Sequence, residues 1–137
     1  MDQRRSWTFL KIERGSAMVE FAIAGSAFSV ILLGIIEFGF AAWQKNTVVS
    51  DARDGTRYAI VHGAASGRIA TPESVTKYVK SRTTLDTAAM SIYTSWASAD
   101  KKPGTEVTVS VAHTVPRRGP FIATHRDSVT SKMRIFF

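Results

Sequence analysis

The chain has 137 residues, a formal net charge of +7 and no cysteine, and 45% of its residues are hydrophobic. This length allows one domain, or a small domain with a tether, and the hydrophobic content argues against wholesale disorder. Without cysteine, any part of the chain outside the cytoplasm must fold without disulfide bonds. The positive charge is scattered and forms no basic stripe interleaved with aromatic residues, which argues against a nucleic-acid-binding function.

Residues 1–15 are polar and basic, and an apolar segment follows them. Residues 21–36 (FAIAGSAFSVILLGII) carry no charge, and Glu37 separates them from a short apolar continuation that ends at Trp43. With its flanking residues the segment is long enough to cross the roughly 30 Å hydrocarbon layer of a membrane. We expect residues 16–43 to span the membrane, with Glu20 and Glu37 near its two interfaces and Trp43 at the far one.

Beyond Trp43 the pattern becomes that of an amphipathic helix. An apolar row is formed by Val48, Ala52, Gly55 and Ala59. The polar side is assigned to Asp51, Arg53, Asp54 and Arg57. The place of Gly55 in the apolar row indicates close packing there, with a simple kink as the alternative. The pattern predicts one helix from about Ser16 to His62, which stops at the loop-forming residues 63–67.

A second helix and three strands are predicted in the remainder. Thr71, Pro72 and Glu73 have the composition of a helix start. The period then changes to two, in segments near residues 90–96, 107–111 and 129–137 that are separated by turn-forming residues 100–104 and 116–120. The last segment places on one face Val129, Met133, Ile135 and Phe137. The sequence therefore predicts an α+β fold with a long N-terminal helix, a short helix and a small antiparallel sheet.

Two general interpretations of the N-terminus leave features unexplained. A cleaved signal peptide fits poorly, because the apolar stretch is long and a helix continues where a small-residue cleavage site is expected. A signal anchor that keeps the basic residues in the cytoplasm fits better. Neither explains Gly15 and Ser16 at the boundary, or Glu20 just inside the segment, where a charge costs about 2.5–3.5 kcal/mol.

Three features occur together in this part of the sequence. Glu20 is the fifth residue counted from Ser16, directly after Gly15, and Phe21 follows it; residues 34–39 read GIIEFG, and residues 52–59 read ARDGTRYA. This combination resembles the TadE-like pseudopilins of the Flp/tight-adherence (Tad) pilus system, which are related to type IV pilins. In the third segment the resemblance is carried by Arg53, Gly55, Arg57 and Tyr58. The C-terminal half resembles these proteins only in its expected elements, which are strands and a loop of variable sequence.

The resemblance implies a function and a domain organisation. Residues 1–15 would be a cytoplasmic leader that a prepilin peptidase removes between Gly15 and Ser16. Residues 16–43 would cross the bacterial inner membrane, and residues 44–137 would form a periplasmic, pilin-like domain. The implied partners are the inner membrane, the prepilin peptidase, other pilins and pseudopilins, and the Tad secretion machinery. The implied function is that of a minor pseudopilin in pilus assembly, surface adhesion and biofilm formation.

The glutamates at the two ends of the apolar segment have different interpretations. We expect Glu20 to neutralise the amino group that cleavage would expose on Ser16, because each charge stabilises the other in apolar surroundings. A glutamate that merely reaches the headgroups is the alternative. For Glu37, a boundary residue and a contact with another pilus component are equally good interpretations.

Two further classes of function remain to be weighed. A signal-anchored adaptor that keeps its N-terminus and never enters a filament is the alternative to the pseudopilin. Catalysis is rejected, because His62, His113 and His125 are scattered and nothing pairs a nucleophile with a base. No metal-ligand spacing or phosphate-binding glycine pattern is present in the sequence, so no cofactor and no metal is expected.

Overall fold

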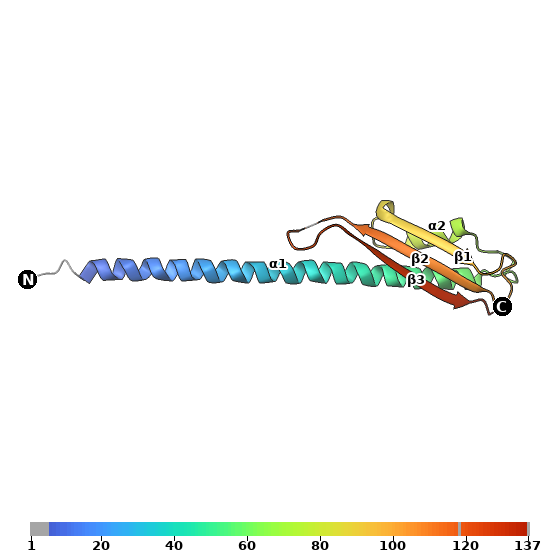
Figure 1. Cartoon of the computed structure of the whole chain (residues 1–137), viewed down its shortest axis with the longest axis horizontal. Helices are drawn as coiled ribbons and strands as arrows, with labels where there is room; N and C mark the ends of the chain where they lie inside the picture. The colour runs from blue at the N-terminus through green and yellow to red at the C-terminus, as the bar shows by residue number, and fades with distance from the viewer. Residues whose placement is uncertain (1–5, 118, 137) are drawn as a thin grey trace, which may run out of the picture. The chain divides into compact units, whose positions relative to one another are not determined.

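The computed structural model describes residues 6–117 and 119–136, with side chains for residues 15–117 and 119–136. Its elements, shown in Figure 1, are α1 (Ser6–Val61), α2 (Pro72–Arg82), the 3₁₀ helix η1 (Thr87–Ala89) and strands β1 (Met90–Trp96), β2 (Glu106–Val115) and β3 (His125–Arg134). The predicted α+β fold, with a long N-terminal helix, a short helix and an antiparallel sheet, is confirmed.

The long helix begins earlier than the sequence predicts. The expected start near Ser16 is wrong, because α1 is already helical at Ser6. Residues 6–14 contain neither proline nor glycine, and the single Gly15 costs a helix only about 1 kcal/mol relative to alanine. Residues 6–14 therefore contain no helix-breaking residue, and Gly15 alone does not end the helix. The predicted end near His62 is confirmed, since α1 ends at Val61.

Internal contacts divide the chain into two compact units, Met1–Gly39 and Phe40–Phe137. The first unit holds the apolar part of α1. The second unit holds the last part of α1 together with α2, η1 and the sheet. We refer to the second unit as the domain.

The sheet of the domain is antiparallel, with the strand order β1-β2-β3. Met90 of β1 lies opposite His113 of β2, and Val111 of β2 lies opposite Val129 of β3. The predicted strand at residues 90–96 is confirmed at both ends, whereas β2 extends beyond the predicted Val111 to Val115. The predicted turn at residues 100–104 is also confirmed. Gly104 there has a φ of 92°, which only glycine adopts without strain.

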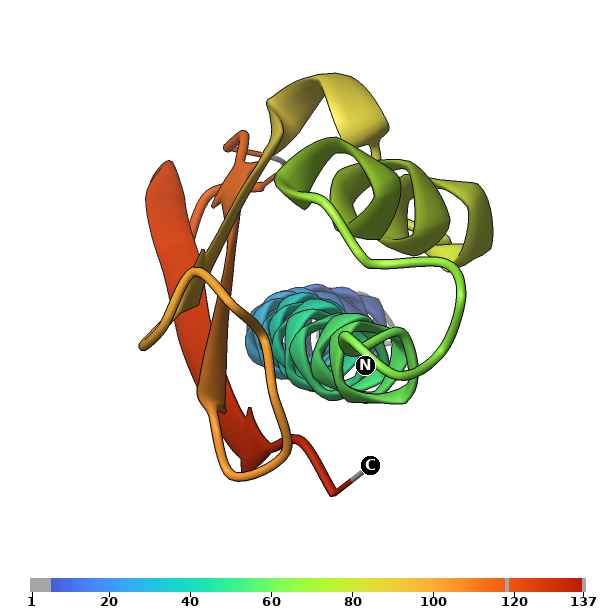
Figure 2. The ribbon, with the colours of Figure 1, turned by 90° about the vertical axis from the view of Figure 1, so that its right-hand side faces the viewer.

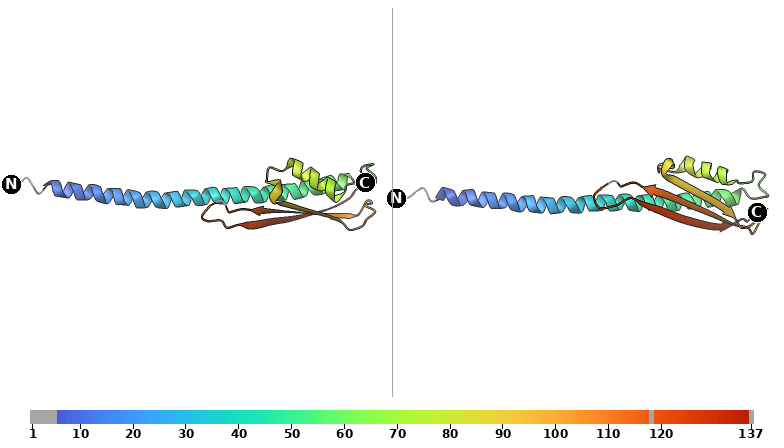
Figure 3. Two further views of the ribbon diagram at one scale, coloured as in Figure 1. Left: turned by 90° about the horizontal axis from the view of Figure 1, so that it is seen from above. Right: turned by 45° about the horizontal axis from the view of Figure 1, so that its top comes forward.

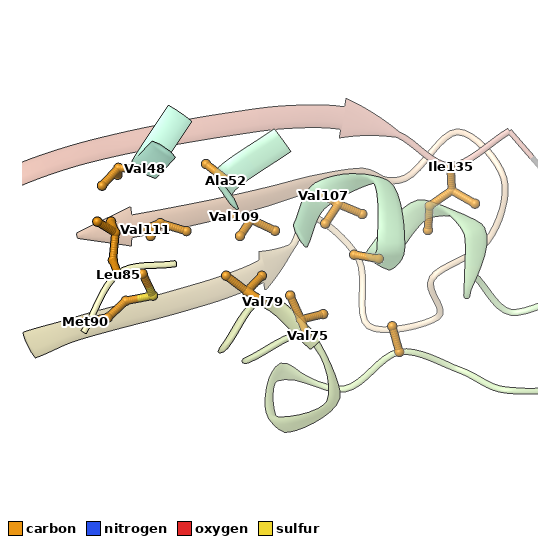
Figure 4. Packing of buried hydrophobic residues seen from close by; sticks show 12 residues of the cluster. Val48, Ala52, Val75, Val79, Leu85, Met90, Val107, Val109, Val111 and Ile135 are labelled. Carbon is orange, nitrogen blue, oxygen red and sulfur yellow. The ribbon is translucent and has the colours of Figure 1, made fainter. Parts of the chain in front are cut away.

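The domain core lies where the sheet and α2 meet the last part of α1 (Figures 2 and 3). The predicted apolar row of α1 is buried, and Val48, Ala52 and Ala59 are 0% exposed. Figure 4 shows Val48 and Ala52 together with valines of α2 and β2. Of the predicted face of the last segment, Ile135 is buried and Val129 and Met133 are half-buried, while Phe137 lies outside the described residues.

A reciprocal pair of hydrogen bonds starts α2. The backbone N–H of Ser74 donates to the Thr71 hydroxyl at 3.2 Å, and the Thr71 N–H donates to the Ser74 hydroxyl at 2.9 Å. Pro72 occupies the first helical turn, where its missing N–H has no partner to lose. The predicted helix start is therefore confirmed, and it directs Val75 and Val79 into the core.

Candidate membrane-spanning and assembly segment

The first part of α1 presents an apolar surface. Among the described residues, one helix is long and apolar enough to cross a membrane, and it covers Gly15–Val61. None of its most apolar stretch is buried, and the side chains of Phe21, Ile35 and Phe38 are 79%, 63% and 73% exposed. A contiguous apolar surface of this kind marks contact with lipid or with another protein. These properties support a membrane-anchored protein.

The hydroxyl groups within this surface are satisfied by the helix itself. Ser26 donates to the carbonyl oxygen of Ala22 at 2.7 Å, and Ser29 donates to that of Gly25 at 2.8 Å. An unpaired hydroxyl in hydrocarbon costs several kcal/mol, so these bonds remove much of the penalty. Both serines are therefore compatible with a lipid environment.

The predicted processing and assembly residues lie in neighbouring turns at the start of the apolar surface. Gly15, Ser16, Glu20 and Phe21 are all exposed on α1. Ser16 and Glu20 are four residues apart, which places them on one face of the helix. The helix passes through Gly15 without a break. At the other end of the surface, Glu37 is half-buried.

Gly55 lies in the domain, at the closest approach of α1 to its neighbours. A Cβ atom at this position would lie 2.8 Å from Cγ2 of Val79 in α2 and 3.3 Å from Cγ1 of Val109 in β2. The first distance is shorter than carbon atoms in contact allow. The predicted close packing at Gly55 therefore agrees with the structure, and α1, α2 and β2 all meet there.

Tyr58 joins α1 to α2 on the rim of the domain. Its ring stacks on Tyr78 of α2 at a centroid distance of 4.4 Å and on His62 at 4.2 Å. The Tyr78 hydroxyl accepts a hydrogen bond from Nη1 of Arg82 at 2.8 Å. Stacked pairs of this kind add about 0.5–1.5 kcal/mol beyond the burial of the rings. Tyr58 therefore stabilises the contact between the two helices.

Arg53 and Arg57 lie on a different face from Gly55. Both are exposed and are four residues apart, so they share one side of α1. In the ARDGTRYA segment, Gly55 and Tyr58 thus contact α2 inside the domain, whereas Arg53 and Arg57 are exposed on its surface.

Residues 15–57 match the model of a protein family described as TadE-like protein. This segment is TadE-like. The match agrees with the resemblance expected from the sequence. No curated protein and no solved structure matches the chain at a significant level.

The TadE-like segment extends across both units of the chain. It contains the exposed apolar surface and most of the part of α1 that belongs to the domain, and it ends at Arg57, before Tyr58. Helix α2 and the three strands lie outside it. The family match therefore covers most of α1, and it does not cover α2 or the three strands, which pack against α1 in the domain.

Asp51 lies on the buried side of α1, contrary to the prediction. It is 8% exposed, and the Thr83 hydroxyl donates to its Oδ2 at 2.7 Å. Burial raises the pKa of Asp51, and the hydrogen bond from Thr83 partly opposes that rise. The spacing of three residues from Val48 and four from Gly55 signals a core-facing position, but the charge of Asp51 led to the opposite assignment.

His113 is a second buried polar residue. It is 3% exposed on the inner face of β2, and neither ring nitrogen has a hydrogen-bond partner among the described residues. It lines a cavity of about 550 Å³ together with Phe40, Trp43 and Gln44 of α1 and Pro116 and Thr124 of the β2–β3 loop. We call this the Trp43 cavity. The alternation of β2 predicts an inward His113, but no local signal predicts the cavity.

Proposed function

We propose that this protein is a minor pseudopilin of a Flp/Tad-type pilus, needed for pilus assembly and surface adhesion. Its precursor spans the inner membrane with the N-terminus in the cytoplasm and residues 44–137 in the periplasm. A prepilin peptidase removes residues 1–15, and the mature chain then interacts with other pilins and pseudopilins of the system. The function requires no catalysis and no cofactor.

The observation that carries the proposal is the TadE-like segment on an exposed apolar helix. The match begins at Gly15, where the leader would end, and the apolar side chains that follow it are exposed. A helix that is exposed and apolar all round suits lipid before assembly and neighbouring helices after it. The same apolar surface would thus contact lipid before assembly and neighbouring pilin helices after assembly.

Glu20 has a physical role in this scheme. Cleavage creates an ammonium group on Ser16, and a buried ammonium is expensive unless it is paired. The spacing of four residues puts the Glu20 carboxylate on the same helix face as Ser16, either in its own chain or presented to a neighbouring subunit. After cleavage at Gly15, Glu20 would be the fifth residue of the chain, near the positive end of the dipole of the shortened helix. Glu20 therefore allows the new N-terminus to enter an apolar assembly.

The second candidate is a membrane-anchored adaptor that is never processed. One observation favours it: α1 continues through Gly15 and Ser16 without interruption, so no extended peptidase substrate is present there. Processing requires local unwinding of the helix. Gly15 makes this easier, because glycine in a helix interior is less favourable than alanine by about 1 kcal/mol.

Two substitutions test the proposal in pilus-producing cells. Gly15→Val should leave an uncut precursor, whereas Glu20→Ala should be cut, remain in the membrane at a normal level and support few or no pili. Glu37→Ala is the matched control, and its effect on pilus number should be milder. Mass spectrometry of the N-terminus and immunoblots of sheared pili give the two measurements.

The outcomes separate the two candidates. A native chain that retains Met1 in cells that make pili contradicts processing and supports the adaptor. Wild-type pilus numbers with Glu20→Ala would show that the pairing of Ser16 and Glu20 is not required.

A further inference from the structure

The β2–β3 loop, residues 116–124, lies beside the point where α1 leaves its apolar run. Pro116 and Thr124, at the two ends of the loop, line the Trp43 cavity together with Phe40 and Trp43. Phe40 and Trp43 are the last aromatic residues of the apolar run. Figure 1 shows the loop at the end of the sheet opposite the C-terminus. Within the domain, the loop thus lies near Phe40 and Trp43, where the chain enters the domain from the apolar run.

The composition of the loop suits a membrane interface. Residues 116–124 read PRRGPFIAT, with two arginines and no acidic residue. Phe121 is 52% exposed, and Trp43, which lines the cavity, is 45% exposed. Aromatic side chains are enriched at the headgroup level of membranes, and cations near the surface are attracted to anionic lipids. This pattern differs from the outer face of the sheet, where hydroxyl and charged side chains predominate.

The loop is held in shape by its own hydrogen bonds. The backbone N–H of Arg117 donates to the Thr124 hydroxyl at 3.2 Å and links the two ends. The Arg117 side chain donates through Nε to the carbonyl oxygen of Gly119 at 3.1 Å. Pro116 and Pro120 further restrict the backbone. A restrained loop loses little conformational entropy on binding, so Phe121 is presented in an ordered way.

We propose that the β2–β3 loop is a second membrane contact of this protein, formed with the bilayer that α1 spans. Phe121 enters the headgroup region, and Arg117 contacts lipid phosphates. The loop and α1 together fix the orientation of the domain on the membrane surface. This inference goes beyond the proposed function and needs only that α1 is anchored, since neither processing nor pilus assembly enters it.

The absence of cysteine from the sequence allows a clean test with single labels. The full chain carrying Phe121→Cys is labelled with a polarity-sensitive fluorophore and reconstituted in vesicles of phosphatidylethanolamine and phosphatidylglycerol. Tyr93→Cys on β1 and Phe136→Cys near the C-terminus are matched controls, because these aromatic side chains are 68% and 77% exposed. Quenching by a lipid that carries a nitroxide is then compared among the three sites.

We expect the label at position 121 to be quenched several-fold more strongly than the labels at positions 93 and 136, with a blue-shifted emission. Equal quenching at the three sites overturns the proposal. A blue shift without quenching by the lipid nitroxide also overturns it, because the label would then be covered by protein, for example by a second copy of the chain.

The contribution of charge is tested in the same system. Arg117→Gln, combined with the label at position 121, should reduce the quenching, whereas Arg134→Gln, an exposed arginine at the end of β3, should leave it unchanged. Vesicles of phosphatidylcholine alone should likewise give weaker quenching at position 121. Quenching that is independent of both Arg117 and lipid charge overturns the assignment of Arg117 to lipid phosphates.

Discussion

Helix α1 contains two stretches that are both apolar but are used in different ways. Before Gly39 its large side chains, such as Phe28 at 62% and Ile31 at 61%, are exposed. After Gln44 the buried residues of α1 other than Asp51 are alanine, glycine, threonine and valine, as at Ala52 and Thr56, both 0% exposed. Side-chain size therefore differs between the exposed stretch of α1 and the face of α1 that packs within the domain.

The difference follows from packing distance. Lipid chains and neighbouring helices adapt to bulky side chains, whereas a sheet and a second helix at fixed distances leave room for little more than a methyl group. Gly55 is the extreme case, because even one added carbon would overlap with Val79. The comparison can be tested by making the same substitution in both environments.

The largest effect is expected for a pair of isoleucines. Ile135 is 1% exposed, so Ile135→Ala should destabilise the domain by about 2–5 kcal/mol through lost burial and a new cavity. Ile35 is 63% exposed in the apolar run, so Ile35→Ala should leave domain stability unchanged. Urea-induced unfolding of the full chain in mild detergent, followed by near-UV circular dichroism, measures both. Equal losses would show that the apolar run contributes to the domain core.

An intermediate effect is expected for a pair of glycines in α1. Gly55→Ala should gain about 1 kcal/mol in helix propensity but lose about 1–3 kcal/mol by overpacking against Val79 and Val109, so a net loss is expected. For Gly39→Ala, the added Cβ meets nothing within 4 Å, and no loss is expected. The same unfolding measurement applies. If Gly55→Ala is more stable than the wild type, Val79 and Val109 rearrange at little cost in free energy.

The smallest effect is expected at the buried carboxylate. Because burial raises the pKa of Asp51, the folded state binds its proton more tightly than the unfolded state. The free energy of unfolding therefore falls as the pH rises from the pKa of Asp51 in the unfolded state to its pKa in the folded state. It stays lowered at neutral pH. Asp51→Asn keeps an oxygen for the Thr83 hydroxyl and removes the charge, so it should stabilise the domain at pH 7.

The control and the pH series for this substitution use the same denaturation experiment. The gain from Asp51→Asn should shrink as the pH falls through the acidic range. Asp100→Asn, at an exposed carboxylate that contacts Lys102 at 3.3 Å, should give no gain. A loss of stability at pH 7 with Asp51→Asn would mean that the negative charge itself is needed, for instance by His113.

Local sequence patterns predicted most of the domain because the deciding interactions are local. The hydroxyl of Thr71 and the following proline determine where α2 begins, and the alternation from Met90 to Trp96 determines β1. The small residues from Val48 to Ala59 likewise indicate the buried face of α1. Each of these signals lies within one turn or one strand.

The features that were missed depend on contacts between distant segments. Asp51 is buried because Thr83, 32 residues away, supplies a hydrogen bond, and no pattern within α1 shows that partner. The Trp43 cavity forms where α1 meets the loop after β2, and the extension of β2 to Val115 depends on its pairing with His125. The helical start at Ser6 has a local cause instead, because Gly15 and Ser16 have the composition of a boundary although the helix continues through them.

The position of β3 at the edge of the sheet bears on aggregation. Among the described strands β3 pairs on one side only, with β2, and an unpaired edge can recruit another chain. Arg126, Lys132 and Arg134 are exposed along this strand. Two copies that approached through their β3 edges would therefore bring like charges together. This repulsion weakens as salt screens it, so colloidal stability of the domain should decline as ionic strength rises.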